Sequence, residues 1–193
     1  NTLFSLQDGN VKKIAIDGSD NRIHALLVAD NGRLWVGSNT GLLYSDRNSN
    51  QPLKAFPELE SLRISALYQA ADKTLLVGTA KEGVFTIDRN SLLTKLPLNT
   101  SEGLSPWIYD IAESPAGNFW FATFGAGLLA YDYRNGEFKS IRKERMLESK
   151  LLDNDIWTLF RDRAGTLWVG TRTGANVLNT SNQGLLHIPA GLP

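Results

Sequence analysis

The sequence contains no cysteine, and its 193 residues include only two histidines and one methionine. A chain without cysteine has no disulfide bonds, no thiolate zinc site and no cysteine nucleophile. The histidines, His24 and His187, are far from metal-ligand spacing, so no zinc site is predicted. No apolar run approaches the roughly 20 residues that a membrane-spanning helix needs. The sequence therefore predicts no metal and no cofactor, and it shows no catalytic constellation.

Neither sign of charge dominates the chain. Twenty basic residues balance twenty acidic ones, and 42% of the residues are hydrophobic, as in an ordinary globular domain. A neutral chain lacks the basic footprint that nucleic acids and anionic membranes attract. We therefore expect no nucleic-acid partner, and membrane contact only through segments outside this chain. The chain begins at Asn1 rather than methionine, and we expect it to be part of a longer protein.

One ten-residue pattern occurs twice, as GRLWVGSNTG at 32–41 and as GTLWVGTRTG at 165–174. Both copies belong to a set of four similar segments, at 23–46, 64–88, 108–132 and 156–179. In every segment an isoleucine precedes a small residue by 14 positions; the small residues are Gly37, Gly78, Ala122 and Gly170. The steps between these small residues are 41, 44 and 48 positions. Constant cores joined by variable connections indicate repeated structural units.

Each repeat is typical of four short strands, with β-branched, aromatic and leucine runs separated by turns rich in Gly, Asn and Asp. Four strands at this period are typical of β-propeller blades. We predict one all-β domain over 1–193, a propeller of four-stranded antiparallel blades with about four full repeats and a partial N-terminal one. The predicted blades span about 1–16 (partial), 21–60, 62–100, 106–143 and 154–190. Unpaired edges favour a fragment of a larger ring, or a ring completed by further blades or by a second copy as a homodimer.

Two local expectations accompany this fold. Trp35, Trp120 and Trp168 share one repeat position, and we expect them to fill the wedge between neighbouring blades. The second repeat has Leu76 at this position and lacks the preceding turn glycine, so we expect its blade to pack more loosely. The segment 143–152 is the best candidate for one short helix.

Two segments carry a family resemblance: LLDNDIWTLFRDRAGTLWVGTRTG at 151–174 and the copy at 101–141. The lead-in Leu-x-x-Asn-Asp-Ile, the centre Gly-x-Leu-Trp-Val-Gly-Thr and the following glycine turn resemble the blade motif of two-component regulator propellers. The resemblance extends over almost the whole chain. In that family such repeats build seven-bladed propellers in the periplasmic sensor regions of bacterial receptors. Their outputs are histidine kinases, hybrid kinases or diguanylate cyclases, and several members sense polysaccharide breakdown products. The resemblance implies a periplasmic sensor region.

The first strand of each blade lines the channel of a propeller, and the positions flanking its leading isoleucine differ from blade to blade. Chemically unlike residues are expected where each blade contributes a different contact to one ligand, although an unconstrained solvent-facing position would show the same scatter. Aromatic faces beside charged groups suit an oligosaccharide or another small molecule. The candidate ligand-binding residues are Arg22, His24, Arg63, Trp107, Tyr109, Asp155 and Trp157.

Three kinds of function fit this sequence. We expect a ligand-sensing propeller with no enzymatic activity in this region. One alternative is an interaction scaffold that binds another protein chain. The other is a propeller lyase or glycosidase, for which His24 is the best candidate base. A glycosidase needs two carboxylates at a fixed separation, and nothing in the sequence pairs any two.

Overall fold

The computed structural model describes residues 3–7, 10–14, 21–46, 52–98, 105–114, 117–143, 151–179 and 184–189. Within these ranges the chain forms strands β1 to β18 and one short 3₁₀ helix, η1 (Pro57–Leu59). The predicted all-β class is therefore confirmed. Most of the predicted helix at 143–152 lies outside the described residues. No helix of the described part is long and apolar enough to cross a membrane.

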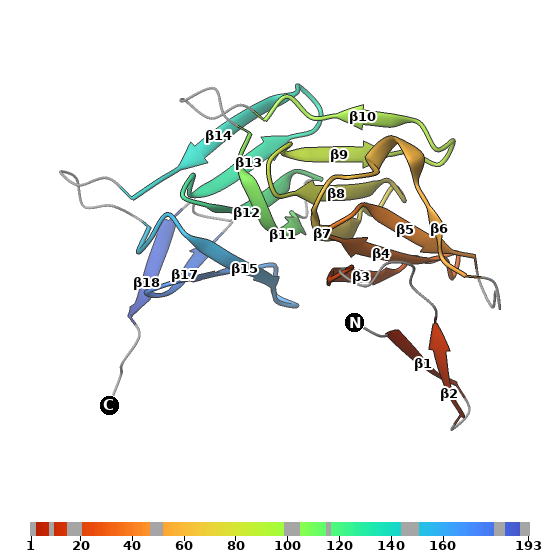
Figure 1. Cartoon of the computed structure of the whole chain (residues 1–193). Coiled ribbons are helices and arrows are strands. Elements are labelled where there is room, and N and C mark those ends of the chain that lie inside the picture. Colours follow the sequence, from red (N-terminus) through yellow and green to blue (C-terminus); the bar gives the residue numbers. More distant parts are fainter. Residues whose placement is uncertain are drawn as a thin grey trace.

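Most of the strands form four-stranded antiparallel sheets, each a meander in chain order (Figure 1). Blade 1 contains β3 (Ile23–Val28), β4 (Leu34–Ser38), β5 (Leu42–Ser45) and β6 (Lys54–Ala55), and blade 2 contains β7 (Ile64–Gln69), β8 (Leu75–Thr79), β9 (Val84–Ile87) and β10 (Leu93–Lys95). Blade 3 contains β11 (Trp107–Glu113), β12 (Phe119–Phe124), β13 (Leu128–Asp132) and β14 (Glu137–Ile141), and blade 4 contains β15 (Ile156–Arg161), β16 (Leu167–Thr171), β17 (Gly174–Asn179) and β18 (Gly184–Pro189). A hairpin of β1 (Leu3–Gln7) and β2 (Asn10–Ile14) precedes them.

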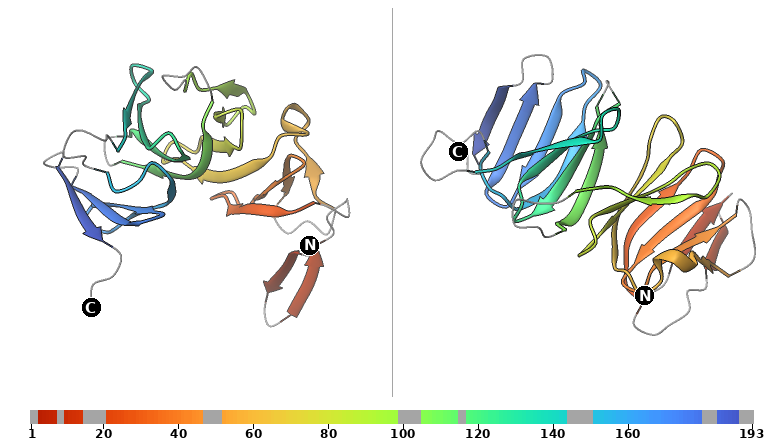
Figure 2. Two further views of the ribbon diagram at one scale, coloured as in Figure 1. Left: turned by 60° about the vertical axis from the view of Figure 1, so that its left-hand side comes forward. Right: turned by 90° about the horizontal axis from the view of Figure 1, so that it is seen from above.

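The four blades follow one another around an open arc, and the first strand of each lies on the inner side (Figure 2). These inner strands contact one another in chain order, β3 with β7, β7 with β11 and β11 with β15. Strand order and arrangement are those of β-propeller blades. A seven-bladed parent ring stays a prediction.

The hydrophobic core is divided among the three junctions between adjacent blades. Its buried residues include Trp35, Phe56, Ile64 and Val77 between blades 1 and 2. They include Ala66, Leu76, Ile108 and Phe121 between blades 2 and 3, and Ala122, Leu128, Ile156 and Val169 between blades 3 and 4. Because the two middle blades are covered on both faces, their strands have continuous apolar sequences rather than alternating ones.

The constant isoleucine-to-glycine spacing of the sequence corresponds to a contact between blades. A Cβ added to Gly37 would lie 2.8 Å from Cγ2 of Ile64, and one added to Gly78 would lie 2.7 Å from Cγ2 of Ile108. Ile64 and Ile108 thus occupy the space that a side chain at Gly37 or Gly78 of the preceding blade would need. At the third junction Ala122 and Ile156 share the same cluster.

The shared tryptophan position fills the space between blades, as expected. Trp35 is 7% exposed and lies 5.4 Å from the ring of Tyr44, while Leu76 is fully buried. Trp120 packs against the core between blades 3 and 4. Trp168 is 38% exposed, because the described chain places no blade on that face, and its indole Nε1 donates a hydrogen bond to Asp162.

The expectation that blade 2 packs loosely is wrong. Every residue of β8 is buried, because blades 1 and 3 cover both faces of this sheet. The turn before β8 closes with the same backbone hydrogen bonds as in blade 1, and Lys73 takes the position of Gly32. Lys73 has a φ of 74°, a left-handed conformation that costs a non-glycine residue roughly 1–2 kcal/mol. The missing glycine therefore strains one turn and leaves the packing intact.

Gly78→Ala is expected to destabilise the protein by about 1–3 kcal/mol, because the added methyl group forces Ile108 away from blade 2. Gly170→Ala, at the same repeat position of blade 4, is the matched control. Its Cβ would meet only Thr158, whose exposed methyl group must shift while its hydroxyl is bonded to Asp110; no buried isoleucine is displaced, so a smaller loss is expected. Urea unfolding measures both. Equal losses in the two variants would contradict the proposed role of the contact between blades.

Candidate functional site

The predicted site residues lie where the chain enters each inner strand. In three blades the carbonyl of the residue before the leading isoleucine accepts a hydrogen bond from the turn after the second strand. The pairs are Asn39 with Arg22 (3.1 Å), Ala80 with Arg63 (3.0 Å) and Arg172 with Asp155 (3.2 Å). This bond places Arg22, Arg63 and Asp155 at equivalent points around the arc.

The residue after the leading isoleucine is a β-bulge in every blade. Between the first and second strands the register shifts at this position, which His24, Ser65, Tyr109 and Trp157 occupy. A bulge adds an unpaired residue to one strand and re-aims its side chain. The Ser65 hydroxyl donates a hydrogen bond to the Ile108 carbonyl of blade 3, and Tyr109 packs against the core between blades 3 and 4, so two of these side chains still contact a junction between blades.

An aromatic cluster forms at this end of blade 3. The rings of Trp107 and Tyr109 are 5.2 Å apart, and Phe124 lies 6.4 Å from Trp107 and 6.2 Å from Tyr109. The guanidinium carbon of Arg63, from blade 2, lies 4.6 Å from the centre of the Trp107 ring. Phe124 is 53% exposed, so the cluster is open to solvent. We call Arg22, His24, Arg63, Trp107, Tyr109 and Phe124 the aromatic–arginine cluster.

Two arginines surround His24 with positive charge. Burial lowers the pKa of His24 below its usual value, and the charges of Arg63 and Arg22 lower it further. The imidazole is therefore neutral at physiological pH. Two ring nitrogens of the cluster, His24 Nε2 and Trp107 Nε1, are buried without a hydrogen-bond partner among the described residues. An unsatisfied buried polar group costs about 1–3 kcal/mol and calls for a partner.

The structure separates the two predicted residues of blade 4 from this cluster. Asp155 accepts a hydrogen bond from the Gly125 backbone at 3.0 Å, and its other oxygen lies 3.8 Å from Nε of Arg172. Its carboxylate therefore joins blade 4 to blade 3. Trp157 is 57% exposed, and within the described chain it makes none of the ring contacts that join Trp107 and Tyr109.

Sequence reasoning missed Phe124, which belongs to the second strand of blade 3. Phe124 pairs directly with Trp107 across the β11–β12 register, so its side chain joins the cluster. The alignment of repeats could have identified it, because the equivalent residues, Asn39, Ala80 and Arg172, are not aromatic.

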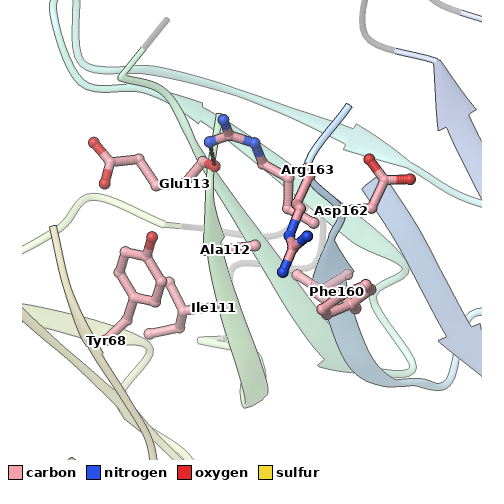
Figure 3. Close-up of a pocket in the computed structure, with 9 residues that line it drawn as sticks. Tyr68, Ile111, Ala112, Glu113, Phe160, Asp162 and Arg163 are labelled. Carbon is pink, nitrogen blue, oxygen red and sulfur yellow. Dashed lines mark hydrogen bonds between the residues drawn. The ribbon is translucent and has the colours of Figure 1, made fainter. Parts of the chain in front are cut away.

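A hollow lies at the opposite end of the inner strands, between blades 2, 3 and 4 (Figure 3). It has a volume of about 420 Å³ and is lined by Tyr68, Ile111, Ala112, Glu113, Leu159, Phe160, Arg161, Asp162 and Arg163. No sequence pattern singled out these residues. We call this hollow the lower groove.

Hydrogen bonds between blades hold one wall of the lower groove together. The Glu113 carboxylate of blade 3 accepts a hydrogen bond of 2.9 Å from the backbone N–H of Ala71 in blade 2. The Gln69 side chain of blade 2 likewise accepts one from the backbone N–H of Asp30 in blade 1. In blade 4 the equivalent residue is Arg161, which donates to the Glu113 carbonyl instead. These side chains have structural partners, which favours a structural role. Among the described residues, no group of three or more His, Cys, Asp or Glu side chains is placed to hold a metal ion.

Comparison with known proteins identifies the repeats. Residues 17–40 and 150–173 match the family described as two component regulator propeller. These two segments are two-component regulator propeller repeats. The second match covers the segment at 151–174 whose motif carried the resemblance, while the copy at 101–141 is outside the matched residues.

Relatives of these propeller repeats include a signalling protein. Over 70 residues, or 36% of this chain, the sequence is 34% identical to histidine kinase P4 of Formosa agariphila, of which it covers 5%. The fold is similar to that of the extracellular domain of a putative hybrid two-component system from B. thetaiotaomicron, with a TM-score of 0.74 and 23% identity. That alignment covers 92% of this chain and 25% of the other, so the chain spans about a quarter of the length of that domain.

The fold is also shared with an enzyme. Virginiamycin B lyase from Staphylococcus aureus aligns with a TM-score of 0.68 and 13% identity, over 91% of this chain and 58% of the lyase. At this level of identity the likeness concerns the fold alone.

The lowered pKa of His24 predicts a pH-dependent loss of stability. The folded protein binds a proton at His24 less readily than the unfolded chain does, so its stability falls as the pH decreases through the unfolded value near 6.5. His24→Gln removes this effect. The difference in unfolding free energy between the native protein and the variant should be constant above pH 7.5 or so and should decline towards about pH 5. Urea unfolding over a pH series measures it, and parallel pH curves would contradict the prediction.

Proposed function

We propose that this propeller is the ligand-recognition region of an extracytoplasmic receptor, located in the periplasm, whose output is of the two-component type. Its ligand is a small molecule of the oligosaccharide class, and the region binds this ligand without transforming it. The observation that carries the proposal is the aromatic–arginine cluster, which gathers unlike side chains from three blades at equivalent positions. The propeller repeats and the similarity to a histidine kinase support the signalling context.

The geometry of the cluster suits a sugar ring. Saccharides bind through their apolar ring faces to aromatic side chains and through their hydroxyls to polar groups at the edge. Trp107, Tyr109 and Phe124 provide several aromatic faces within one site, and Phe124 is open to solvent. The buried nitrogens of Trp107 and His24 have hydrogen-bonding capacity that the described chain does not use.

Recognition fits His24 better than catalysis does. A histidine base is normally oriented and assisted by a carboxylate, which stabilises the imidazolium that forms during the reaction. His24 is instead flanked by Arg63 and Arg22, whose positive charges oppose protonation. This environment disfavours the lyase alternative.

Ligand binding should depend on Trp107. A saccharide present at about 100 times its dissociation constant should stabilise the native protein against unfolding by roughly 2.7 kcal/mol. Thermal unfolding with a panel of oligosaccharides should show this increase for one sugar class, and Trp107→Ala should abolish it.

Phe160→Ala is the control for this experiment, because Phe160 is 63% exposed and lies in the lower groove at the other end of the inner strands. Loss of the ligand effect in Phe160→Ala, with Trp107→Ala unchanged, would place the site in the lower groove instead. Conversion of the ligand during incubation would show that the region is an enzyme.

We also propose that the two open faces of the arc dock further blades of the same kind, and that a second copy of the chain can supply them. Blade 4 exposes Trp168 on the strand that contains Gly170, the position that receives an isoleucine in blades 1 and 2. Blade 1 exposes Leu26 and Val28 on the strand that begins with Ile23. One face thus provides the glycine of the contact between blades, and the other provides the isoleucine.

Sedimentation velocity of the purified protein tests this association. We expect reversible head-to-tail association that increases with concentration and that Trp168→Glu abolishes. Leu92→Glu is the control, since Leu92 is 64% exposed in a turn of blade 2, away from both faces. A native protein that stays monomeric at every concentration would contradict docking by a second copy.

A further inference from the structure

The aromatic–arginine cluster combines cations and hydrogen-bond donors, and within the described part of the chain no acid forms an ion pair with its arginines. We propose that its ligand is an anionic saccharide, one whose sugar ring carries a carboxylate or a sulfate group. This inference rests on the proposed function and specifies the class of ligand at the same site.

Among the described residues, the two arginines of the cluster have no carboxylate partner. In the described chain no Asp or Glu oxygen lies within salt-bridge distance of the guanidinium of Arg22 or Arg63. Other surface cations do have such partners, for example Arg33 with Asp46 at 2.7 Å and Lys95 with Glu82 at 2.7 Å. The cluster therefore keeps two uncompensated positive charges.

Two carboxylates at the start of blade 4 are engaged elsewhere. Asp155 accepts the Gly125 backbone N–H, and Asp153 lies 3.3 Å from Nε of Arg172. The charges of Arg22 and Arg63 are both close enough to act on His24, so they act within one small region. An anion bound near His24 would therefore be attracted by the charges of both arginines at once.

The hydrogen-bonding groups point to the same ligand chemistry. Guanidinium groups and the indole N–H of Trp107 only donate, and the indole has no acceptor among the described residues. A carboxylate or sulfate supplies several acceptor oxygens, and charge-assisted hydrogen bonds are roughly twice as strong as neutral ones. A neutral sugar offers hydroxyl acceptors but leaves both charges uncompensated.

Arg63 is held in a defined orientation for this role. Its guanidinium lies 4.6 Å from the centre of the Trp107 ring, a cation–π contact that holds the planar group over the aromatic face. The N–H edge then remains available to pair with an anion beside the ring. One ligand can therefore stack on the exposed aromatic side chains and place its acidic group against Arg63.

A matched pair of saccharides tests the inference by isothermal titration calorimetry. The probes are a disaccharide that contains a uronic acid and the same disaccharide with its carboxylate reduced to the alcohol; a sulfated disaccharide forms a third arm. We expect the acidic forms to bind about 10-fold more tightly or better, since one charge-assisted contact is sufficient for this difference. Added salt should reduce the preference. A tighter sulfated probe would assign the anion as sulfate, and a tighter uronate probe would assign it as carboxylate.

Arg63→Gln and Arg22→Gln should abolish the preference, so that each variant binds the acidic and the reduced disaccharide with equal affinity. Arg134→Gln is the control, because Arg134 is exposed in the turn between β13 and β14 and should keep the native preference. Equal affinities of the native protein for acidic and neutral probes would overturn the inference and leave the proposed function standing. Failure of all three probes to bind would overturn the saccharide assignment and the inference together.

Discussion

The contact between each leading isoleucine and the small residue of the preceding blade is the constraint on which the rest of the structure depends. A glycine at positions 37 and 78 lets Ile64 and Ile108 approach the neighbouring backbone within a distance that no side chain would allow. The inner strands of adjacent blades consequently lie side by side, and the starts of those strands converge. The aromatic–arginine cluster exists because three blades are held in this register.

The bulge after the leading isoleucine separates structural positions from variable ones. Residues before and beyond it alternate between the two faces of a blade, where buried junctions restrict them to apolar side chains. His24, Ser65, Tyr109 and Trp157 occupy the extra position, which accepts polar and aromatic side chains even where, as at Ser65 and Tyr109, the side chain contacts a junction between blades. One fold can therefore present a different residue from every blade at the same end of the arc, which explains the chemical scatter at these positions.

The repeat architecture could be predicted from the sequence because its signal is periodic, whereas contacts between blades depend on spatial register. Strand order, blade class and the wedge role of Trp35 follow from a pattern written four times. The packing of blade 2 did not follow, since it depends on covered faces rather than on the turn in which Lys73 replaces glycine. The engagement of Asp155 by Gly125 was equally inaccessible, because it arises from a contact with another blade.

Placement of the cluster across blades 1 to 3 has a consequence for signal transmission. A ligand changes a conformational equilibrium only through different affinities for the two states. Arg22 and His24 belong to blade 1, Arg63 to blade 2 and Trp107 to blade 3, so a bound ligand spans two junctions between blades. Those junctions are close-packed and resist gradual deformation. The positive charges of Arg22 and Arg63 disfavour the compact cluster when no ligand is bound. The indole N–H of Trp107, which has no acceptor among the described residues, disfavours it as well. An anionic ligand would compensate the charges and accept the hydrogen bond. Under the proposed function, binding would therefore favour arrangements of the arc in which the three inner strands are drawn together.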